Sequence, residues 1–404
     1  MKTAIVGGGA AGFFLAICLK AMCREMEVTI FEKSKKVLAK VEISGGGRCN
    51  CTNSFAEVRD LQYVYPRGHR LMKRLMKGFS QKDAYEGFES HGVRLVTQED
   101  QCVFPMSQNS HSIINCFLAE ARRLGVEVIT ETKIVSLDEL SGYDFVAVTT
   151  GGSPKAEGLK WLADKGHDIE TPVPSLFTLR IDDKDLQALM GTVVERAVTM
   201  IPGTKMRAEG PLLITHWGMS GPAILKLSSY AARHLAERDY KVQLAVNWTN
   251  LRDTEVLSAL DEIAIRCSQK QLQTIAPCGI PSRLWNYLVN KCLGNRASGR
   301  WGSLNRKELN RLANILSGGD MYQTTGRAAF KDEFVTCGGV SLSSVSPATL
   351  ESKKIPHLYF AGEVLDIDGI TGGFNFQAAW TTAYTVAQAI ARSCHESCQV
   401  EPVV

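Results

Sequence analysis

Short apolar runs alternate with longer apolar stretches at the start of the chain. Residues 3–6 form an apolar run of strand length, and Phe13 to Met22 has the length and composition of a helix. A second strand-like run, Glu27 to Phe31, follows. The pattern predicts a strand, a tight turn, a helix and a second strand, as in a parallel α/β sheet.

Three glycines occupy the predicted turn. Gly7, Gly9 and Gly12 have the Gly-x-Gly-x-x-Gly spacing in the strand, turn and helix context that dinucleotide binding requires. Glycine there lets backbone amides approach a pyrophosphate and lets the helix pack close to the strand, while the helix N-terminus attracts the phosphate charge. Glu32 ends the second strand, where its carboxylate accepts hydrogen bonds from adenosine ribose hydroxyls. The sequence therefore predicts a dinucleotide-binding unit.

Two later segments favour FAD over NAD. The apolar run 145–148 ends in a Thr-Gly turn at 149–152, which resembles the second motif of two-dinucleotide flavoproteins. The run 357–361 leads into an acidic, glycine-rich segment, and a helix is predicted from about residue 375 to 392. This order places acidic side chains beside ribityl hydroxyls and a helix N-terminus at the flavin pyrimidine, where reduction builds negative charge. The alternative is a strand and helix that serve only the sheet.

A glycine-dense segment, predicted as a loop, lies between residues 40 and 53. Successive glycines allow the backbone to lie against a flat ring or a phosphate. Arg48 is a candidate contact to the pyrophosphate or the flavin pyrimidine edge, and Asn50 and Asn53 are candidate donors to ring carbonyls. A purely structural loop is the alternative.

The composition is that of a globular protein with two or three domains. The chain has 404 residues and a net charge of +4, too small a surplus to indicate a polyanionic partner by itself. The 12 cysteines are scattered and form no Cys-x-x-Cys pair, so we expect free thiols in a reducing compartment and no metal site. Glycines interrupt the apolar N-terminus and no apolar stretch has spanning length, so we expect a cytoplasmic protein without a membrane partner.

Motifs along nearly the whole chain resemble those of one flavoprotein family, the BaiN-type bile-acid 3-dehydro-Δ4,6-reductases and aminoacetone oxidase, which are NAD(P)/FAD-dependent oxidoreductases. The chain departs from the family pattern at Cys51, at Gln101-Cys102 and at 153–156, so no particular substrate is carried over. The resemblance rests on Gly7-Gly8-Gly9-Ala10-Ala11-Gly12, Ile43-Ser44-Gly45-Gly46-Gly47-Arg48-Cys49-Asn50, Phe104-Pro105, Thr215-His216-Trp217-Gly218-Met219-Ser220-Gly221-Pro222, Gly338-Gly339-Val340, Gly362-Glu363-Val364-Leu365-Asp366 and Gly372-Gly373-Phe374-Asn375-Phe376-Gln377.

The residues and the resemblance together assign the FAD contacts to four segments of the chain. The candidates are Gly7, Gly9, Ala11, Gly12, Glu32 and Lys33 in the first segment; Lys40, Ser44, Gly46, Arg48, Cys49 and Asn50 in the second; Val135, Thr150 and Gly151 in the third; and Gly362, Glu363, Asp366, Gly373, Phe374, Asn375 and Gln377 in the fourth.

The resemblance also implies an α/β fold in which a Rossmann FAD domain is built from both chain ends and carries an insertion. We expect the FAD domain over 1–184 and 335–404 and a substrate or cap region over 185–334. Strands at 193–200 and 241–248 predict a β-barrel-like part at about 185–250. Helical patterns over 255–275 and 281–316 predict a helical part at about 255–318.

The chemistry expected of such a protein is a two-step hydride transfer. No second glycine fingerprint is present, so we expect NADH or NADPH to dock transiently over the flavin, under the inserted region, and then leave. Hydride would pass from nicotinamide to flavin N5 and then to an activated C=C of an enone-like small molecule. His216 is the candidate catalytic acid, and a structural role in the turn 215–222 is its alternative. Cys49 has no partner at disulfide-reductase spacing, so no redox thiol is predicted.

Two alternative functions remain open. The first is a flavin oxidase of a small amine or amino ketone. The second is an RNA-binding or RNA-modifying flavoprotein, suggested by Arg67, Arg70, Lys73, Arg74 and Lys77 at helical spacing. A solvated face of an amphipathic helix explains the same pattern, so we expect a small-molecule substrate and no nucleic-acid partner. The oligomeric state is not predicted.

Overall fold

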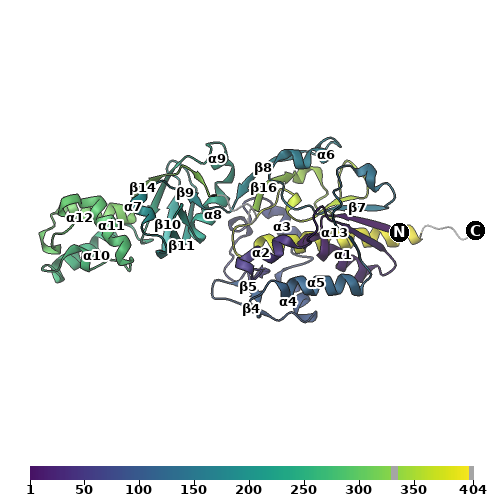
Figure 1. Ribbon diagram of the computed structural model, residues 1–404, viewed down its shortest axis with the longest axis horizontal. Coiled ribbons are helices and arrows are strands. Elements are labelled where there is room, and N and C mark those ends of the chain that lie inside the picture. Colours follow the sequence, from purple (N-terminus) through teal and green to yellow (C-terminus); the bar gives the residue numbers. More distant parts are fainter. Residues whose placement is uncertain (329–334, 400–404) are drawn as a thin grey trace, which may run out of the picture. The chain divides into compact units, whose positions relative to one another are not determined.

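The computed structural model describes residues 1–328 and 335–399, with side chains up to residue 396, and divides the chain into two compact units (Figure 1). Unit 1 contains Met1–Pro174 and Lys331–Val404, and unit 2 contains Ser175–Phe330. Unit 1 is therefore built from both ends of the chain. The predicted junction between residues 334 and 335 borders 329–334, which lie outside the described residues.

A five-stranded parallel sheet forms the centre of unit 1. Its order is β17-β7-β1-β2-β6, so a strand from the C-terminal part of the chain extends a sheet begun by the N-terminal part. The predicted α/β Rossmann fold from both chain ends is thereby confirmed. The strands are β1 (Lys2–Val6), β2 (Glu27–Phe31), β6 (Glu127–Ile129), β7 (Phe145–Val148) and β17 (Leu358–Phe360).

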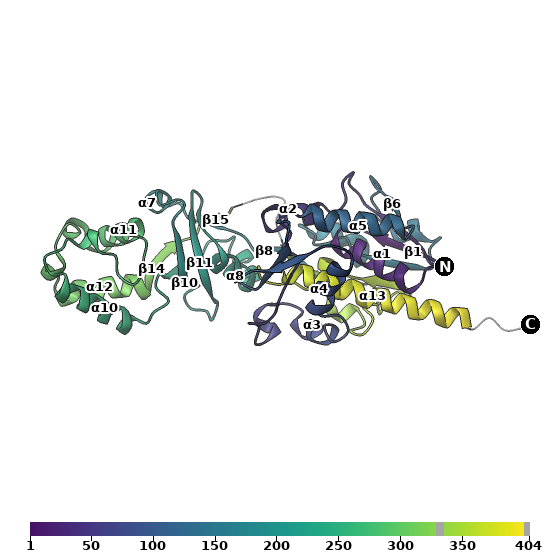
Figure 2. The same cartoon turned by 90° about the horizontal axis from the view of Figure 1, so that it is seen from below.

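Helices α1 (Ala10–Met22) and α13 (Phe374–Gln399) pack side by side in both views (Figures 1 and 2). Aromatic rings fill the space between them, since Phe14 lies 5.2 Å from Trp380 and Trp380 lies 5.6 Å from Phe117, centroid to centroid. Such contacts stabilise a core beyond the effect of burial alone. The first helix of the chain, α1, and the last, α13, are thus held in one core.

Smaller elements complete unit 1. A three-stranded antiparallel sheet has the order β3-β5-β4, and a two-stranded sheet pairs β16 with β8. The strands are β3 (Thr52–Asn53), β4 (Leu95–Thr97), β5 (Cys102–Pro105), β8 (Ile169–Ser175) and β16 (Val335–Val340); the helices are α2 (Ala39–Gly47), α3 (His69–Leu75), α4 (Gln81–Ser90), α5 (His111–Arg123) and α6 (Lys160–Ala163).

Unit 2 consists of a β-rich part and a helical part, as predicted. Its seven-stranded sheet has the order β14-β13-β10-β11-β12-β9-β15, with β14 and β15 at its edges. The strands are β9 (Leu179–Arg180), β10 (Val193–Met200), β11 (Arg207–Thr215), β12 (Gly218–Ser220), β13 (Gln243–Asn247), β14 (Gly318–Gln323) and β15 (Gly326–Arg327); the helices are α7 (Lys184–Gln187), α8 (Pro222–Tyr230), α9 (Ala232–Ala236), α10 (Asp253–Arg266), α11 (Ser282–Leu293) and α12 (Arg306–Ser317).

Several boundaries differ from those predicted. The helix predicted over 255–275 ends at Arg266. Unit 2 begins at Ser175 rather than at residue 185, because Leu179 and Arg180 pair with β12 and β15 of unit 2. The helical stretch 281–316 is divided between α11 and α12, since Gly294 takes a left-handed φ of 54° at the end of α11. The segment predicted as a loop after residue 40 begins as helix α2.

Among the residues that the structure describes, no helix is both long and apolar enough to cross a membrane.

Candidate FAD site

Two of the three fingerprint glycines in the turn between β1 and α1, Gly7 and Gly12, tolerate no side chain. A Cβ on Gly12 would lie 2.1 Å from the carbonyl oxygen of Gly7, and one on Gly7, whose φ is +117°, would lie 2.5 Å from the carbonyl oxygen of Thr149. A Cβ on Gly9 would meet no protein atom within 4 Å. The turn is therefore tightly packed at Gly7 and Gly12, whereas the backbone at Gly9 has open space beside it.

The N-terminus of α1 is free to bind an anion. Gly9 is the residue before the helix, and no side chain caps the amides of the first turn. Those amides need acceptors, and the helix dipole favours a negative charge in front of them. Together with the open side of Gly9, this arrangement fits the pyrophosphate of a dinucleotide.

Glu32 is held beside the same turn. Its Oε2 accepts a hydrogen bond from the Gly8 amide at 2.9 Å, and its Oε1 accepts from the amide and hydroxyl of Ser34 at 2.9 and 2.6 Å. A carboxylate has about four acceptor sites, so lone pairs remain for ribose hydroxyls. Glu32 therefore lies where the fingerprint predicts the ribose-binding acid.

The third predicted segment holds the glycine turn in place. The Thr149 hydroxyl donates to the carbonyl of Gly7 at 2.9 Å, and Thr149 is buried. Thr150 is exposed next to it, and Gly151 has a φ of +72°. Thr149 was missing from the predicted contacts, although its place one residue before Thr150 in a Thr-Thr-Gly turn was the available signal.

The glycine-dense segment bends sharply at the end of α2. Gly45 and Gly46 have φ values of 57° and 69°, and a Cβ on Gly46 would meet no protein atom within 4 Å. The guanidinium of Arg48 lies over the ring of Phe104, 4.2 Å from its centroid, and donates to the carbonyl of Gly45 at 3.1 Å. The cation–π contact fixes Arg48 beside an exposed, side-chain-free backbone that a flat ring can approach.

Burial governs the chemistry of the cysteine that follows Arg48. Cys49 is fully buried with a left-handed φ of 62°, and its amide donates to the carbonyl of Ser44 at 3.0 Å. This burial raises the pKa of the Cys49 thiol to about 12, although a hydrogen bond with Ser44 opposes the shift. Cys49 is therefore a neutral thiol at physiological pH rather than a nucleophile.

The turn after β17 packs directly against α1. Gly362 has a φ of +78°, and a Cβ there would lie 2.9 Å from the Cβ of Ala11. The next residue, Glu363, accepts from Lys40 Nζ at 2.8 Å and from the Thr336 amide at 2.8 Å. The structure thus brings together three predicted contacts from distant segments: Ala11, Lys40 and Glu363.

The loop before α13 meets the end of the glycine-dense segment. A Cβ on Gly373 would lie 2.2 Å from the carbonyl oxygen of Thr52. The Asn50 amide, oriented by its hydrogen bonds, donates to that carbonyl at 2.9 Å and accepts from the Gly373 amide at 3.2 Å. The close approach explains the need for glycine at 373, and it joins two of the four predicted segments.

Two predicted contacts have their amide groups engaged within the protein. Asn375 donates to and accepts from the backbone of Gly369, at 2.9 and 2.8 Å. Gln377 is fully buried, accepts from Thr52 at 2.6 Å and donates to Thr381 at 3.0 Å. These side chains shape the loop before α13, and their direct contact with FAD stays a prediction.

A buried ion pair anchors the same loop. Arg67 Nε donates to Asp368 Oδ1 at 2.5 Å, and Arg67 Nη2 contacts Oδ2, with the Asp368 side chain fully buried. Burial would lower the pKa of the Arg67 guanidinium, yet the ion pair raises it above its usual value. Nearby, the Tyr65 hydroxyl donates to the carbonyl of Phe374 at 2.8 Å. Neither Arg67 nor Asp368 was among the predicted site residues; the acidic segment after 362 was the only signal.

The family model described as "HI0933-like protein Rossmann domain" matches residues 1–389. The chain belongs to the HI0933-like family. It is a family of FAD-dependent oxidoreductases, so the dinucleotide that fits the site of this HI0933-like chain is FAD.

Similar curated proteins cover nearly the whole chain. One is the ribosomal RNA dihydrouridine synthase of Haemophilus influenzae, 26% identical over 96% of this chain and 98% of that protein. Its Escherichia coli counterpart by name is 28% identical over 95% and 96%. The 3-dehydro-bile acid delta(4,6)-reductase of Clostridium scindens is 26% identical over 96% and 99%, which confirms the predicted family resemblance. The solved 3-ketosteroid delta1-dehydrogenase of Sterolibacterium denitrificans aligns over 97% and 99% with a TM-score of 0.49 and 12% identity.

The remaining predicted FAD contacts of this HI0933-like chain lie at the surface of unit 1 or within its loops. Lys33 is exposed after Glu32. Val135 is 52% exposed, and its amide donates to Glu139 at 2.9 Å. The Asp366 amide donates to the carbonyl of Val340 at 3.0 Å. Their contact with FAD stays a prediction.

His216 lies in unit 2, at the tip of the hairpin between β11 and β12. It is exposed, and its ring lies 4.6 Å from that of Trp217, centroid to centroid. The Thr215 hydroxyl accepts from the Trp217 amide at 3.3 Å and so holds the turn without the imidazole. His216 is therefore available for chemistry, and its catalytic role stays a prediction.

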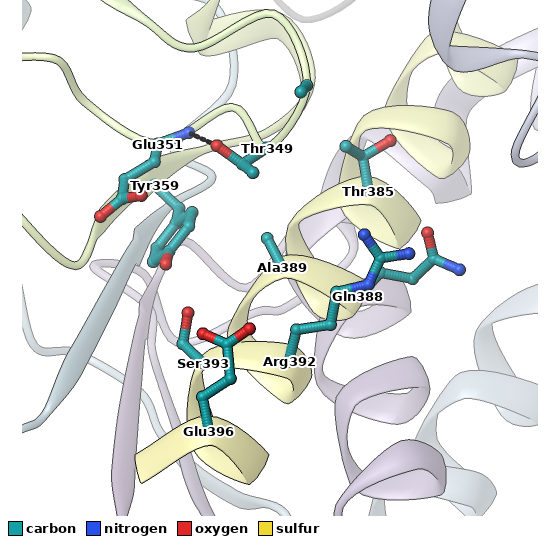
Figure 3. Close-up of a pocket in the computed structure, with 10 residues that line it drawn as sticks. Thr349, Glu351, Tyr359, Thr385, Gln388, Ala389, Arg392, Ser393 and Glu396 are labelled. Carbon is teal, nitrogen blue, oxygen red and sulfur yellow. Dashed lines mark hydrogen bonds between the residues drawn. The ribbon is translucent and has the colours of Figure 1, made fainter.

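A separate pocket of about 200 Å³ lies along the C-terminal part of α13 (Figure 3). Polar side chains such as Tyr359, Gln388 and Arg392 line it. Because a helix rises about 1.5 Å per residue, Arg392 lies about 27 Å along α13 from Phe374. This pocket is not part of the FAD site.

Proposed function

We propose that the protein is an NAD(P)H-driven flavin reductase that saturates a carbon–carbon double bond conjugated to a carbonyl group. When bound, FAD supplies this chemistry by accepting a hydride from NADH or NADPH at N5 and passing it to the substrate. The product gains that hydride at the carbon β to the carbonyl and a proton at the α carbon, so two electrons and two protons are balanced.

The names of the similar proteins support this reaction class. A 3-dehydro bile acid with Δ4,6 unsaturation has its double bonds conjugated to the C3 carbonyl, and uridine has its C5=C6 bond conjugated to the C4 carbonyl. Reduction of uridine, or of the Δ4 bond, needs hydride transfer to the carbon β to the carbonyl, and reduction of the Δ6 bond needs the same transfer to the conjugated δ carbon. One FAD site therefore suits both substrate types, which differ in shape and charge rather than in chemistry.

The observation that carries the proposal is the four-segment cradle of unit 1. The α1 N-terminus with open Gly9 would hold the pyrophosphate, and Glu32 would hold the ribose. Arg48, fixed over Phe104 beside the open backbone at Gly46, would orient the ring system. The acid that protonates the α carbon is proposed to be His216.

An anaerobic spectrum tests the first half-reaction. The purified protein is reconstituted with FAD, and the oxidised-flavin absorbance is followed after addition of NADH or NADPH. Bleaching by either nucleotide is expected. A band that persists would refute the nicotinamide-driven reaction, and oxygen consumption with a small amine or amino ketone would then identify an oxidase.

The second half-reaction is tested by reoxidation of the reduced flavin without oxygen. A 3-keto-4,6-diene steroid and a uridine-containing RNA are offered separately, and the saturated product is identified by mass. Return of the flavin band with either acceptor supports the proposal. Replacement of His216 by Asn should slow this step without slowing flavin reduction; unchanged turnover would remove His216 from the mechanism.

A further inference from the structure

A long stretch of unit 1 contains cations and no acids. Between Asp60 and Asp83 the sequence has no aspartate or glutamate, although the whole chain has 46 basic and 42 acidic residues. Helix α3 lies in the middle of this stretch. The cations in it are Arg67, Arg70, Lys73, Arg74, Lys77 and Lys82.

Four of these cations form an exposed face, which we call the basic face. Arg70, Lys73, Arg74 and Lys77 are all exposed. The first three follow the i, i+3, i+4 spacing of one side of α3, and Lys77 lies in the turn just after the helix. None of the four has an ion pair or a side-chain hydrogen bond with any residue between 1 and 328 or between 335 and 396. Their charge is therefore uncompensated.

The opposite side of α3 is buried against unit 1. Leu71, Met72 and Leu75 are at most 9% exposed. A membrane-binding helix presents apolar side chains beside its cations, whereas the apolar side of α3 is already packed. The basic face thus suits a hydrated polyanion better than a lipid surface.

The basic face is fixed to the loop that forms the FAD site. At its start, Arg67 pairs with buried Asp368, and a Cβ on Gly68 would lie 2.7 Å from the Ile367 side chain. Helix α3 packs beside α13 (Figure 2), and after α3 the carbonyl of Phe79 accepts from the Thr381 hydroxyl of α13 at 3.0 Å. A ligand held by α3 is therefore positioned relative to FAD by a packed connection.

We propose that the basic face binds the phosphate backbone of an RNA whose uracil base is the substrate of the FAD site. This inference rests on the proposed function and names the substrate class. From Arg70 to Arg74 the helical part of the face spans about 6 Å, which is roughly two nucleotides at a rise of 3.4 Å, and Lys77 follows in the next turn. Tyr63, 59% exposed in the turn before α3, adds an aromatic ring of the kind on which unpaired bases stack. Two similar proteins bear names that specify ribosomal RNA.

Binding is tested with the FAD-loaded full-length protein and a fluorescein-labelled RNA stem–loop that contains uridines in its loop. Four phosphate contacts predict that raising KCl from 50 to 200 mM weakens binding about 50- to 150-fold. The double variant Arg70→Gln/Arg74→Gln loses two contacts, so its affinity at 0.1 M salt should fall about 25- to 60-fold, with a shallower salt dependence.

A matched control removes the same charge elsewhere on unit 1. Arg94 and Arg122 are exposed, and neither has an ion pair with the residues that the structure describes. The variant Arg94→Gln/Arg122→Gln should bind the RNA like the unaltered protein. Flavin bleaching by NADH or NADPH is measured in all three proteins and should be equal, which shows that each variant is folded and loaded.

The outcomes separate this inference from the proposed function. Loss of RNA affinity in the basic-face variant alone supports it, even if neither nucleotide bleaches the flavin. Equal losses in both variants, absence of salt-sensitive RNA binding, or binding to anionic phosphatidylserine vesicles in place of RNA would each overturn it. Reduction of the steroid enone without any RNA binding would leave the proposed function intact and would refute RNA binding by the basic face.

Discussion

Two glycines of the first turn allow FAD binding to be separated from folding. Gly9 and Gly12 are three residues apart, yet an added methyl group meets open space at one and a carbonyl oxygen at the other. Gly9→Ala should weaken FAD binding and leave the apoprotein nearly as stable. Gly12→Ala should destabilise the apoprotein itself.

The magnitudes follow from the local geometry. Gly9 has a φ of −94°, which alanine adopts freely. Alanine is a poorer N-cap residue than glycine, so Gly9→Ala should lower the free energy of unfolding of the apoprotein by about 0.5 kcal/mol. A methyl there crowds the phosphate, and losing one hydrogen bond to a charged group, about 1.5–3 kcal/mol, raises the Kd for FAD about 10- to 150-fold. At Gly12 the 2.1 Å approach demands a shift of about 1 Å in backbone. Overpacking of about 3 kcal/mol less about 1 kcal/mol of helix propensity leaves about 2 kcal/mol of destabilisation.

Two assays distinguish these effects. Urea unfolding of the apoproteins gives the free energy of unfolding, and titration with FAD, followed by quenching of flavin fluorescence, gives the Kd. If Gly9→Ala bound FAD as tightly as the unaltered protein, no phosphate would lie before α1. If Gly12→Ala were as stable as the unaltered protein, the packing argument would be wrong.

Three further predictions concern named side chains. Arg67→Met should cost about 3–5 kcal/mol in urea unfolding because it leaves the buried carboxylate of Asp368 uncompensated, and Arg67→Met/Asp368→Leu should recover most of that; a loss below about 1 kcal/mol in the single variant would contradict this. Glu32→Gln should raise the Kd for FAD about tenfold, and an unchanged Kd would exclude a ribose contact. The pKa of Cys49 is raised by burial to about 12, so the thiol of the unfolded chain ionises first. The free energy of unfolding should therefore fall by about 1.4 kcal/mol per pH unit between about pH 9 and pH 12, and Cys49→Ala should lack this contribution; equal slopes in urea unfolding at pH 8.5 and 10.5 would contradict it.

The first of the four segments of the site could be predicted because the residues that define it are close together in the sequence. The run from β1 to Glu32 combines a strand, glycines, a helix and an acid within a short segment, and each part supports the same structure. The strand predicted at 193–200 is likewise β10, whose β-branched residues favour a strand whatever surrounds it.

Other features depend on partners that are distant in sequence. Arg67 shares its spacing with exposed cations, whereas its ion pair with Asp368, 301 residues away, makes it an anchor of the loop before α13. Gln377 belongs to a motif that suggests ligand contact, but Thr52, 325 residues away, binds its amide. No periodicity of charge or hydrophobicity encodes such pairings, because they arise only when both chain ends enter one sheet.

The pairing of β8 with β16 bears on how the protein can change over evolution. The chain passes from unit 1 to unit 2 at the end of β8 and is again part of unit 1 at β16, so both ends of the insertion connect to two paired strands. The entropic cost of closing a loop between two adjacent chain ends rises only slowly with the length of the loop. Substitutions, insertions or a wholesale exchange of unit 2 can therefore accumulate while the nucleotide cradle stays intact. A single nucleotide-binding scaffold can in this way carry different insertions without changes in its own sheet.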